Sequence, residues 1–350
     1  MKKAIAAGLA LILLFNLGCA PEKKRFQAEF LTLFNTVTRI VGYAQSEEEF
    51  RNLAQKIYDE LLEYHQLYDI YHDYEGVNNL KTINDNAGIA PVAVDARIID
   101  MLEFARKQCE RSGGRVNVAL GGVFKIWHDY RQAGTEDPEN AELPPMNLLK
   151  EAAQHADIDD LVIDRVASTV FLKDAKMHLD CGAIAKGYAV EQVALYLEDL
   201  GVESLLLSVG GNIRAIGERA QPDDKGEKRW MIGIQNPDKS SEQKELLVVR
   251  IAGLSVVSSG VYERYYTVEG RRYHHVIDPE TLMPSAYFDQ VTILCQDSGL
   301  ADALSTAIFN MPLEEGKAYI ENLDGAEALW VLKDGSLQYS SGFMDYVKTD

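Results

Sequence analysis

The stretch that organises this chain reads His178-Leu179-Asp180-Cys181-Gly182-Ala183-Ile184-Ala185-Lys186-Gly187. A strand-like run over residues 169–179 leads into it, and an amphipathic helical pattern over residues 190–200 leads out of it. A strand that turns through small residues into a helix leaves N–H groups unpaired at the helix start, and these groups favour an anion. Lys186 adds a positive charge in the first turn, so the stretch indicates a ligand site, with phosphate as the best candidate. A plain helix start with an exposed lysine is the alternative.

Length and charge restrict the class of protein. The chain has 350 residues and a formal net charge of -19. This length supports one large domain or two, and the composition is that of a globular protein. The negative charge argues against a nucleic-acid partner. A local anion site can still be built against the global charge, for instance around a metal ion.

The first residues carry a targeting signal. Lys2 and Lys3 precede an apolar run over residues 4–14 that is short for a membrane-spanning helix. Leu17-Gly18-Cys19-Ala20 resembles the lipobox of bacterial lipoproteins, in which the cysteine is acylated and becomes the mature N-terminus. We therefore expect a signal peptide over residues 1–19, lipidation at Cys19 with palmitate among the acyl chains, a tether over residues 20–30 and one domain over residues 31–350. The protein would be lipid-anchored at the bacterial cell membrane and face the periplasm or the cell exterior. An ordinary signal peptide with a chance cysteine is the alternative.

Many strands with interspersed helices predict an α+β fold, since the pattern is not a strict βαβα alternation. Strands are predicted over residues 30–43, 169–179, 204–209, 213–216, 230–234, 246–251, 255–258, 262–268, 271–277, 291–295, 329–332 and 337–339. Helices are predicted over residues 46–67, 95–112, 147–156, 190–200, 300–311 and 313–323. The polar segment 134–145 is expected to be a surface excursion.

A helix near the C-terminus carries oxygen ligands on one side. Asp302, Ser305 and Thr306 fall within one helical turn and can face the same way. Mg²⁺ takes hard oxygen ligands, few of them from protein, with room for waters and substrate phosphates. The alternative is that Asp302 caps the helix or pairs within its first turn, while Thr306 bonds back to a carbonyl.

Histidine and cysteine side chains give weaker signals. His274 and His275 end a predicted strand and should face opposite sides, so one of them is a candidate general base and either one can be a packed or surface histidine. After Cys19 is set aside, Cys109, Cys181 and Cys295 remain without zinc-like spacing or a disulfide framework. Cys181 could be a nucleophile, but a small buried apolar residue is the favoured interpretation.

Taken together, these motifs resemble those of one family. The run from Leu179 to Ala189 is similar to the DLGAIAKGYA signature of the ApbE family, the FAD:protein FMN transferases. Further similar motifs follow in the family's order: Val209-Gly210-Gly211-Asn212, Ser259-Gly260-Val261-Tyr262-Glu263-Arg264, His275-Val276-Ile277-Asp278-Pro279 and Ala301-Asp302-Ala303-Leu304-Ser305-Thr306-Ala307. Phe34-Asn35-Thr36 and the segment from Asn78 to Asn84 resemble N-terminal motifs of the family. Many members are also lipoproteins, in agreement with Cys19.

The resemblance implies a single domain of mixed, largely antiparallel strands with flanking helices that binds FAD and Mg²⁺. Members cleave the FAD pyrophosphate, transfer FMN to a Thr or Ser of a partner flavoprotein in a membrane redox complex, and release AMP. Two other functions fit the same fold: an Mg²⁺-dependent FAD pyrophosphatase that releases FMN and AMP to water, and a surface lipoprotein that only captures FAD.

The resemblance also implies roles for individual residues. The metal ligands would be the Ala183 carbonyl, Asp302 and Thr306, with Ser305 nearby, and His275 would be the base for the attacking hydroxyl. The residues that contact FAD would be Phe34, Asn117, Asp180, Lys186 and Val276. The sequence departs from the family at Cys181, where Leu is commoner, at Asn117, where Asp is usual, and at Leu282-Met283, where Gly is usual. The departure at Asn117 bears on flavin or adenine contact, and none of the three removes a metal ligand.

Overall fold

The computed structural model describes residues 23–31 and 33–349. The predicted signal peptide and the lipidation site at Cys19 lie outside this part of the chain. No helix within the described part is both long enough and apolar enough to cross a membrane.

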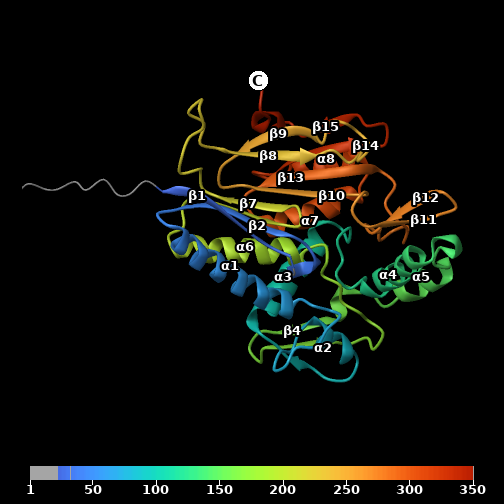
Figure 1. The fold of residues 1–350 in the computed structure, drawn as a ribbon. Coiled ribbons are helices and arrows are strands. Elements are labelled where there is room, and N and C mark those ends of the chain that lie inside the picture. The colour runs from blue at the N-terminus through green and yellow to red at the C-terminus, as the bar shows by residue number, and fades with distance from the viewer. Residues whose placement is uncertain (1–22, 32, 350) are drawn as a thin grey trace, which may run out of the picture.

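An eight-stranded antiparallel sheet forms the centre of the molecule (Figure 1). In spatial order its strands are β1 (Lys24–Phe30), β2 (Thr38–Ala44), β6 (Leu205–Val209), β7 (Asn212–Ile216), β10 (Ser255–Gly260), β13 (Phe288–Cys295), β14 (Glu327–Leu332) and β15 (Leu337–Tyr339). Almost every residue of β13 is buried, because both faces of the sheet are covered there. The predicted α+β fold with largely antiparallel strands is confirmed.

Helices cover one face of the sheet, and a hairpin covers the other. The helical side contains α1 (Glu47–Leu67), α3 (Ala96–Arg111), α6 (Ala185–Asp199), α7 (Ser298–Phe309) and α8 (Leu313–Glu321), which enclose the main core. The opposite face packs against β8 (Trp230–Gln235) and β9 (Glu245–Ile251) through a second apolar cluster that includes Trp230, Val249 and Phe343. Of the helices, α7 packs on β10 and β13 and also on α6, so it is a central element.

Smaller elements surround the lower and outer parts of the molecule (Figure 1). They are α2 (Leu80–Asp85), β3 (Val92–Ala93), α4 (Gly121–Glu136), α5 (Met146–Ala153), β4 (Leu161–Asp164), β5 (Thr169–Leu172), β11 (Tyr265–Val268) and β12 (Arg271–His274), with 3₁₀ turns at Leu33–Asn35, Pro138–Asn140, Ile158–Asp160 and Phe343–Tyr346. The strands β3, β5 and β4 form a small sheet of their own, and β11 pairs only with β12 within the described chain.

The predicted tether over residues 20–30 is wrong from Lys24 onward. Residues Lys24–Phe30 form β1, which pairs with β2 along its whole length. Phe26 stacks on Phe50 of α1 with ring centroids 5.5 Å apart, so the strand is attached to the main core. The prediction failed because β1 is an edge strand, whose outward side chains are polar and whose overall pattern therefore resembles a solvated linker.

Local backbone chemistry explains three other differences. The predicted strand 30–43 is broken because Phe34 and Asn35 both adopt the left-handed region, each with φ of 52°. The predicted strand 169–179 ends at Leu172, since the Asp174 carboxylate accepts the Lys176 N–H at 2.7 Å and forms a turn. The expected surface excursion 134–145 begins as the last turn of α4. In contrast, the helix predicted over residues 46–67 is confirmed, and Ser46 caps it by accepting the Glu49 N–H at 3.1 Å.

Candidate functional site

The turn before α6 is held from both sides. The Leu179 N–H donates to Asn84 Oδ1 at 2.7 Å, and Asn84 Nδ2 donates back to the Leu179 carbonyl at 3.0 Å. The Asp180 N–H donates to the Val118 carbonyl at 2.9 Å, while its carboxylate accepts the Gly182 N–H at 2.8 Å. These bonds fix the backbone of the turn, so the small residues that follow are presented in one conformation.

Gly187 brings α6 and α7 into close contact. Its N–H donates to Asp302 Oδ2 at 2.8 Å. A Cβ atom at position 187 would lie 2.4 Å from Asp302 Cβ and 2.5 Å from the Ser298 carbonyl oxygen. Only glycine therefore fits at this crossing, and the glycine of the opening stretch serves helix packing.

The same bond leaves the Ala183 carbonyl without a partner. In a regular helix the Gly187 N–H would donate to the carbonyl four residues earlier, which is that of Ala183. The Ile184 and Ala185 N–H groups both donate to the Cys181 carbonyl instead, at 2.9 and 2.7 Å. Within the described residues no hydrogen bond reaches the Ala183 oxygen. The Gly187 N–H is thus bonded to a buried carboxylate, and the Ala183 carbonyl oxygen is left without a hydrogen bond.

Asp302 is an electrostatically strained group. It is 6% exposed, and burial raises the pKa of its carboxyl group. The Lys186 ammonium, the Gly187 N–H and the Asn212 amide act in the opposite direction on that pKa. Lys186 Nζ lies 3.4 Å from the Gly210 carbonyl and so bridges α6 to the β6–β7 turn. These three groups offset only part of the cost of burying the charged carboxylate, because the pKa of Asp302 is still raised. A bound cation would offset the rest.

The hydroxyls on α7 behave differently from each other. Ser305 is fully buried, donating to the Asp302 carbonyl at 2.8 Å and lying 2.8 Å from Ser259 Oγ. Thr306 is partly exposed, and its hydroxyl forms no hydrogen bond within the described chain. The cap of α7 is Asp297, which accepts the Leu300 N–H at 2.9 Å. The alternatives in which Asp302 caps the helix and Thr306 bonds to a carbonyl therefore do not describe this structure.

These oxygens fit Mg²⁺. The unpaired Ala183 carbonyl, the buried Asp302 carboxylate and the free Thr306 hydroxyl are all hard donors. Across residues 23–31 and 33–349, no group of three or more His, Cys, Asp or Glu side chains could hold a metal ion. A site with one carboxylate leaves coordination positions for waters and phosphate oxygens, as Mg²⁺ requires.

A buried ion pair supports this arrangement, and the sequence analysis missed it. Arg214 on β7 donates to Glu191 of α6 at 3.0 Å, and Glu191 Oε2 also accepts the Ser298 N–H at 2.7 Å. The Ser298 hydroxyl donates to Asn212 Oδ1, which places the Asn212 amide beside Asp302. The network joins α6, β7 and the first turn of α7, so it fixes the elements that carry Asp302 from within the core.

The two histidines occupy different environments, as predicted. His274 Nε2 donates to the Ser285 carbonyl at 2.9 Å, its Nδ1 accepts the Val276 N–H at 3.3 Å, and its ring packs edge-on against Phe309. It is a packed histidine. His275 faces the other way, and its Nδ1 is buried without a hydrogen-bond partner in the described chain. Burial and the charges of Arg264, His274 and Arg131 lower the pKa of His275 to about 3, so its imidazole is neutral and is a weaker base than an ordinary histidine.

The charges of Arg131 and Arg264 both lower the pKa of His275, so both guanidinium groups act at the same place. Neither guanidinium makes a salt bridge within the described residues. Burial and the charge of Arg264 lower the pKa of Arg131, while Asp180 and Tyr71 partly compensate. Arg131 Nη2 lies 3.1 Å from His128 Nδ1, and the His128 ring lies 5.6 Å from that of Tyr71. Two unpaired arginines at one place favour an anionic ligand.

Of these two arginines, only Arg264 could be singled out from the sequence. Arg264 lies inside a motif, but Arg131 lies on α4, where no spacing links it to the other residues. The segment from His178 to Gly187 interacts both with the arginines near His275 and with the oxygen donors of α7. The Asp180 charge raises the pKa of Arg131 and of Tyr71. Further along the segment, the Lys186 charge lowers the pKa of Asp302, and the Gly187 N–H donates to the Asp302 carboxylate.

The remaining predicted residues have other neighbours. Phe34 packs edge-on against His65, with ring centroids 5.5 Å apart. Val276 is buried in the main core, and its carbonyl accepts the Ser285 N–H at 3.0 Å. Asn117 uses both ends of its amide in the fold, donating to the Ala156 carbonyl at 2.9 Å and accepting the Ala119 N–H at 2.9 Å. Cys181 is buried, and burial raises the pKa of its thiol, as a structural cysteine requires.

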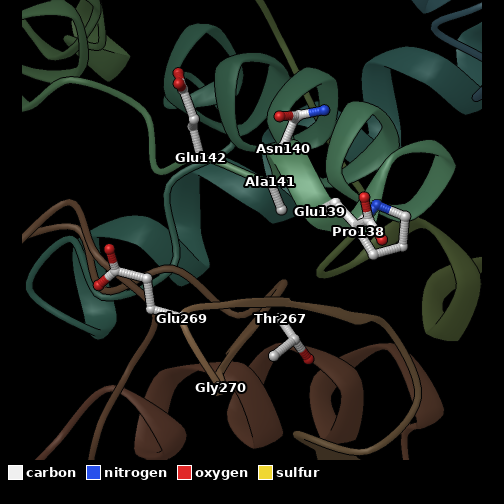
Figure 2. A pocket seen from close by; sticks show the side chains of 8 residues that line it. All are labelled: Pro138, Glu139, Asn140, Ala141, Glu142, Thr267, Glu269 and Gly270. Carbon is white, nitrogen blue, oxygen red and sulfur yellow. The ribbon is translucent and has the colours of Figure 1, made fainter.

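Two surface clefts lie away from these residues. The first, of about 570 Å³, separates the segment 138–142 from Thr267, Glu269 and Gly270 of the β11–β12 hairpin (Figure 2). Figure 2 shows the carboxylates of Glu139, Glu142 and Glu269 around it. The second cleft, of about 580 Å³, lies between α1, the segment 76–78 and β3. None of the predicted site residues lines either cleft.

Comparison with known proteins identifies the family. The model of the ApbE family matches residues 34–330. A protein of Treponema pallidum named FAD:protein FMN transferase is 36% identical over 77% of this chain and 75% of its own length. One of Klebsiella pneumoniae with the same name is 31% identical over 79% of this chain and 83% of its own length. The crystal structure of the ApbE protein of Thermotoga maritima superimposes with a TM-score of 0.79 at 27% identity, covering 93% of this chain and all of that protein. This chain belongs to the ApbE family.

Proposed function

We propose that this protein is an Mg²⁺-dependent FAD:protein FMN transferase. It cleaves FAD, attaches FMN through a phosphoester to a Thr or Ser of a partner flavoprotein, and releases AMP. Its curated relatives carry the transferase name. The observation that supports the proposal most is the bond from the Gly187 N–H to the buried Asp302 carboxylate, which leaves the Ala183 carbonyl without its helical partner.

The metal site would be formed by backbone and side-chain oxygens. The Ala183 carbonyl, Asp302 and Thr306 would hold Mg²⁺, while Ser305 supports the α7 backbone at Asp302. When bound, the ion would neutralise charge on the diphosphate. Lys186 and the N–H groups at the start of α6 add positive potential at the same place. Phosphoryl transfer depends mainly on such positioning and charge stabilisation, so the site supplies what the reaction needs.

His275 would act on the nucleophile. Negative charge on a bound diphosphate would offset the charges of Arg264 and Arg131 and raise the pKa of His275 toward the range of a general base. Its imidazole would then accept the proton of the acceptor hydroxyl as the new O–P bond to the FMN phosphorus forms and the P–O bond to AMP breaks. Arg131 and Arg264 are placed to stabilise negative charge on the flavin phosphate or the leaving group. The proton is then released from His275 to solvent. FAD contact is assigned to Lys186 and Val276, with Phe34, Asn117 and Asp180 as further contacts.

The reaction is tested with the purified full chain, FAD, Mg²⁺ and a protein domain that carries an acceptor threonine. A mass increase of one FMN on the acceptor, together with free AMP, is the expected result. FMN and AMP without a modified acceptor would instead identify a pyrophosphatase. Unchanged FAD that remains bound to the protein would identify a flavin-capturing lipoprotein.

The cellular location is part of the same proposal. The lipobox at Cys19 supports a lipid anchor at the bacterial cell membrane, with the catalytic domain facing the periplasm or the cell exterior. An acceptor subunit of a membrane redox complex would be accessible from that position.

A further inference from the structure

We propose that the acceptor polypeptide docks as an added strand on the outer edge of β12, through an extended, acidic segment that carries the hydroxyl. The inference rests on the proposed transferase function, because that function requires a protein hydroxyl next to His275. It identifies the surface that binds the partner and the chemistry of the segment that is bound.

The β11–β12 hairpin has one open edge. It projects from the body of the molecule beside α4 and α5 (Figure 1). β11 packs against α4 and the Pro138–Asn140 turn, and Tyr266 Oη donates to the Glu142 carbonyl at 3.1 Å. β12 pairs with β11 and with no other strand of the described chain. An unpaired strand edge is a template for an additional strand.

The register shows which backbone groups are free. Glu269 and Gly270 form the two-residue turn, with φ of 48° and 77°. The turn bond joins Val268 to Arg271, so this is a hydrogen-bonded pair. Pairs alternate along an antiparallel ladder, so Thr267 and Arg272 form the next, non-bonded pair and their N–H and C=O groups point outward. Arg272 therefore offers a donor and an acceptor to a strand beside β12.

Charge selects an acidic partner. Residues 264–274 contain three arginines, Arg264, Arg271 and Arg272, and one glutamate, in a chain whose net charge is -19. Arg272 lies over the ring of Tyr265 at 4.8 Å and Arg271 over that of Tyr273 at 5.4 Å, so both guanidinium groups are held along the strands. An acidic segment is attracted to this hairpin and repelled by most of the remaining surface.

Charge also distinguishes the two edges. The outer edge of β11 faces the cleft of Figure 2, which is lined by Glu139, Glu142 and Glu269. An acidic segment would be repelled there. Two of the three arginines, Arg271 and Arg272, lie on β12, which ends at His274 immediately before His275. A strand advances about 3.3 Å per residue, so a segment paired with Arg272 carries a residue a few positions away toward the His275 imidazole.

The test separates docking from chemistry. A short synthetic peptide with one central threonine, valine neighbours and aspartates at both ends is added to the full chain with FAD and Mg²⁺. Hydrogen exchange is measured on the hairpin amides, and peptide affinity is measured by fluorescence anisotropy. We expect slowed exchange at Arg272 and weaker binding of a matched peptide with lysine ends. Unchanged exchange in β12, or equal binding of both peptides, would overturn the proposal.

Two proline variants locate the edge. Arg272→Pro removes the outward N–H of β12 without breaking a bond of the hairpin, whereas Thr267→Pro does the same on β11. Arg272→Ala removes the same guanidinium but keeps the N–H, so it is the reference for the proline variant. We expect Arg272→Pro to bind the peptide about tenfold more weakly than Arg272→Ala does, the equivalent of one strand hydrogen bond, and Thr267→Pro to bind it as the unchanged chain does. FAD binding and the melting temperature, measured in both variants, show that the fold is intact. Equal losses in the two variants would contradict docking at β12.

The mass of the peptide reports on the proposed function independently. A peptide that gains FMN while β12 stays unprotected would overturn the docking site and leave the transferase assignment in place. A peptide that protects β12 while FAD yields only FMN and AMP would support the docking site and contradict the transferase assignment.

Discussion

Asp302 and Gly187 are hydrogen-bonded to each other at 2.8 Å, through the carboxylate of one helix and the backbone N–H of another. This bond joins α7 to the first turn of α6 and removes the donor that would otherwise satisfy the Ala183 carbonyl. One contact therefore aligns a carboxylate and exposes a carbonyl oxygen. The candidate metal site depends on this hydrogen bond as well as on the charge of the Asp302 carboxylate.

Asp302→Asn should abolish metal-dependent turnover while the fold is retained. Asparagine still accepts the Gly187 N–H, and because burial penalises the charged carboxylate, the neutral variant should unfold at the same or a higher temperature without Mg²⁺. We expect turnover to fall by at least about a hundredfold. Magnesium titration by calorimetry and thermal unfolding measure the two effects. Asp297→Asn, which alters the cap of α7, is the matched control and should keep Mg²⁺ binding. Full Mg²⁺-dependent activity in Asp302→Asn would remove this residue from the metal site.

Gly187→Ala should separate α6 from α7. The added methyl group would lie 2.4 Å from Asp302 Cβ, closer than real contacts allow, so the helices must shift. We expect a loss of about 1–3 kcal/mol in the free energy of unfolding, together with weaker Mg²⁺ binding. Gly122→Ala on α4 is the control, because its methyl group would meet Ala152 Cβ at an ordinary 3.7 Å. Denaturant unfolding gives the free energy of unfolding of both variants. Equal values for Gly187→Ala and Gly122→Ala would show that α6 and α7 leave room for a methyl group at position 187.

His275→Asn should lose transfer and retain FAD binding. The substitution removes the proton acceptor but leaves Arg131 and Arg264 in place. We expect the rate to fall by about 10²–10⁴-fold, the usual contribution of a general base. Rapid-quench measurement of AMP release gives the rate, and quenching of flavin fluorescence gives the affinity. An unchanged rate would show that another group accepts the proton.

Acid should destabilise the protein through His274. Burial lowers the pKa of His274 to about 4 in the folded state, whereas the unfolded chain keeps the ordinary value of 6.5. The unfolded state therefore binds the proton first, so the stability present above pH 6.5 is lost as pH falls toward 4. The slope is about 1.4 kcal/mol per pH unit for this one group. His274→Gln keeps a donor for the Ser285 carbonyl and cannot titrate, so its unfolding curves should depend less on pH. An identical pH dependence in the variant would assign the effect to other residues.

Cys19→Ala should release the protein from the membrane fraction. A thioether-linked lipid and an acylated N-terminus require the cysteine, and two acyl signals are needed for stable anchoring. Fractionation of cells that express the variant, with labelled palmitate in the medium, measures both location and lipidation. A variant that stays in the membrane fraction and still incorporates label would exclude Cys19 as the anchor.

Much of the fold could be predicted because its signals are local. Ser46 caps α1, the Glu269-Gly270 pair makes a two-residue hairpin turn, and Gly210-Gly211 turns β6 into β7 with φ of 54° and 84°. Each of these depends on a few neighbouring residues. The errors arose where tertiary contacts override such signals, as in β1, whose polar sequence is a strand only because β2 lies beside it.

What the sequence by itself determined is the set of residues at the candidate site: the small-residue turn before Lys186, the oxygen donors of α7, and the histidine after β12. The oxygen donors of α7 follow from residue type and spacing along one helix, whereas the Ala183 carbonyl and His275 follow from the resemblance to the ApbE family. Only the tertiary structure decided that Gly187 meets Asp302, that Glu191 and Arg214 support them, and that the charges of Arg131 and Arg264 both act on His275. The physical reason is distance along the chain, because contacts between remote segments depend on how whole helices and strands pack, and no local pattern encodes that packing.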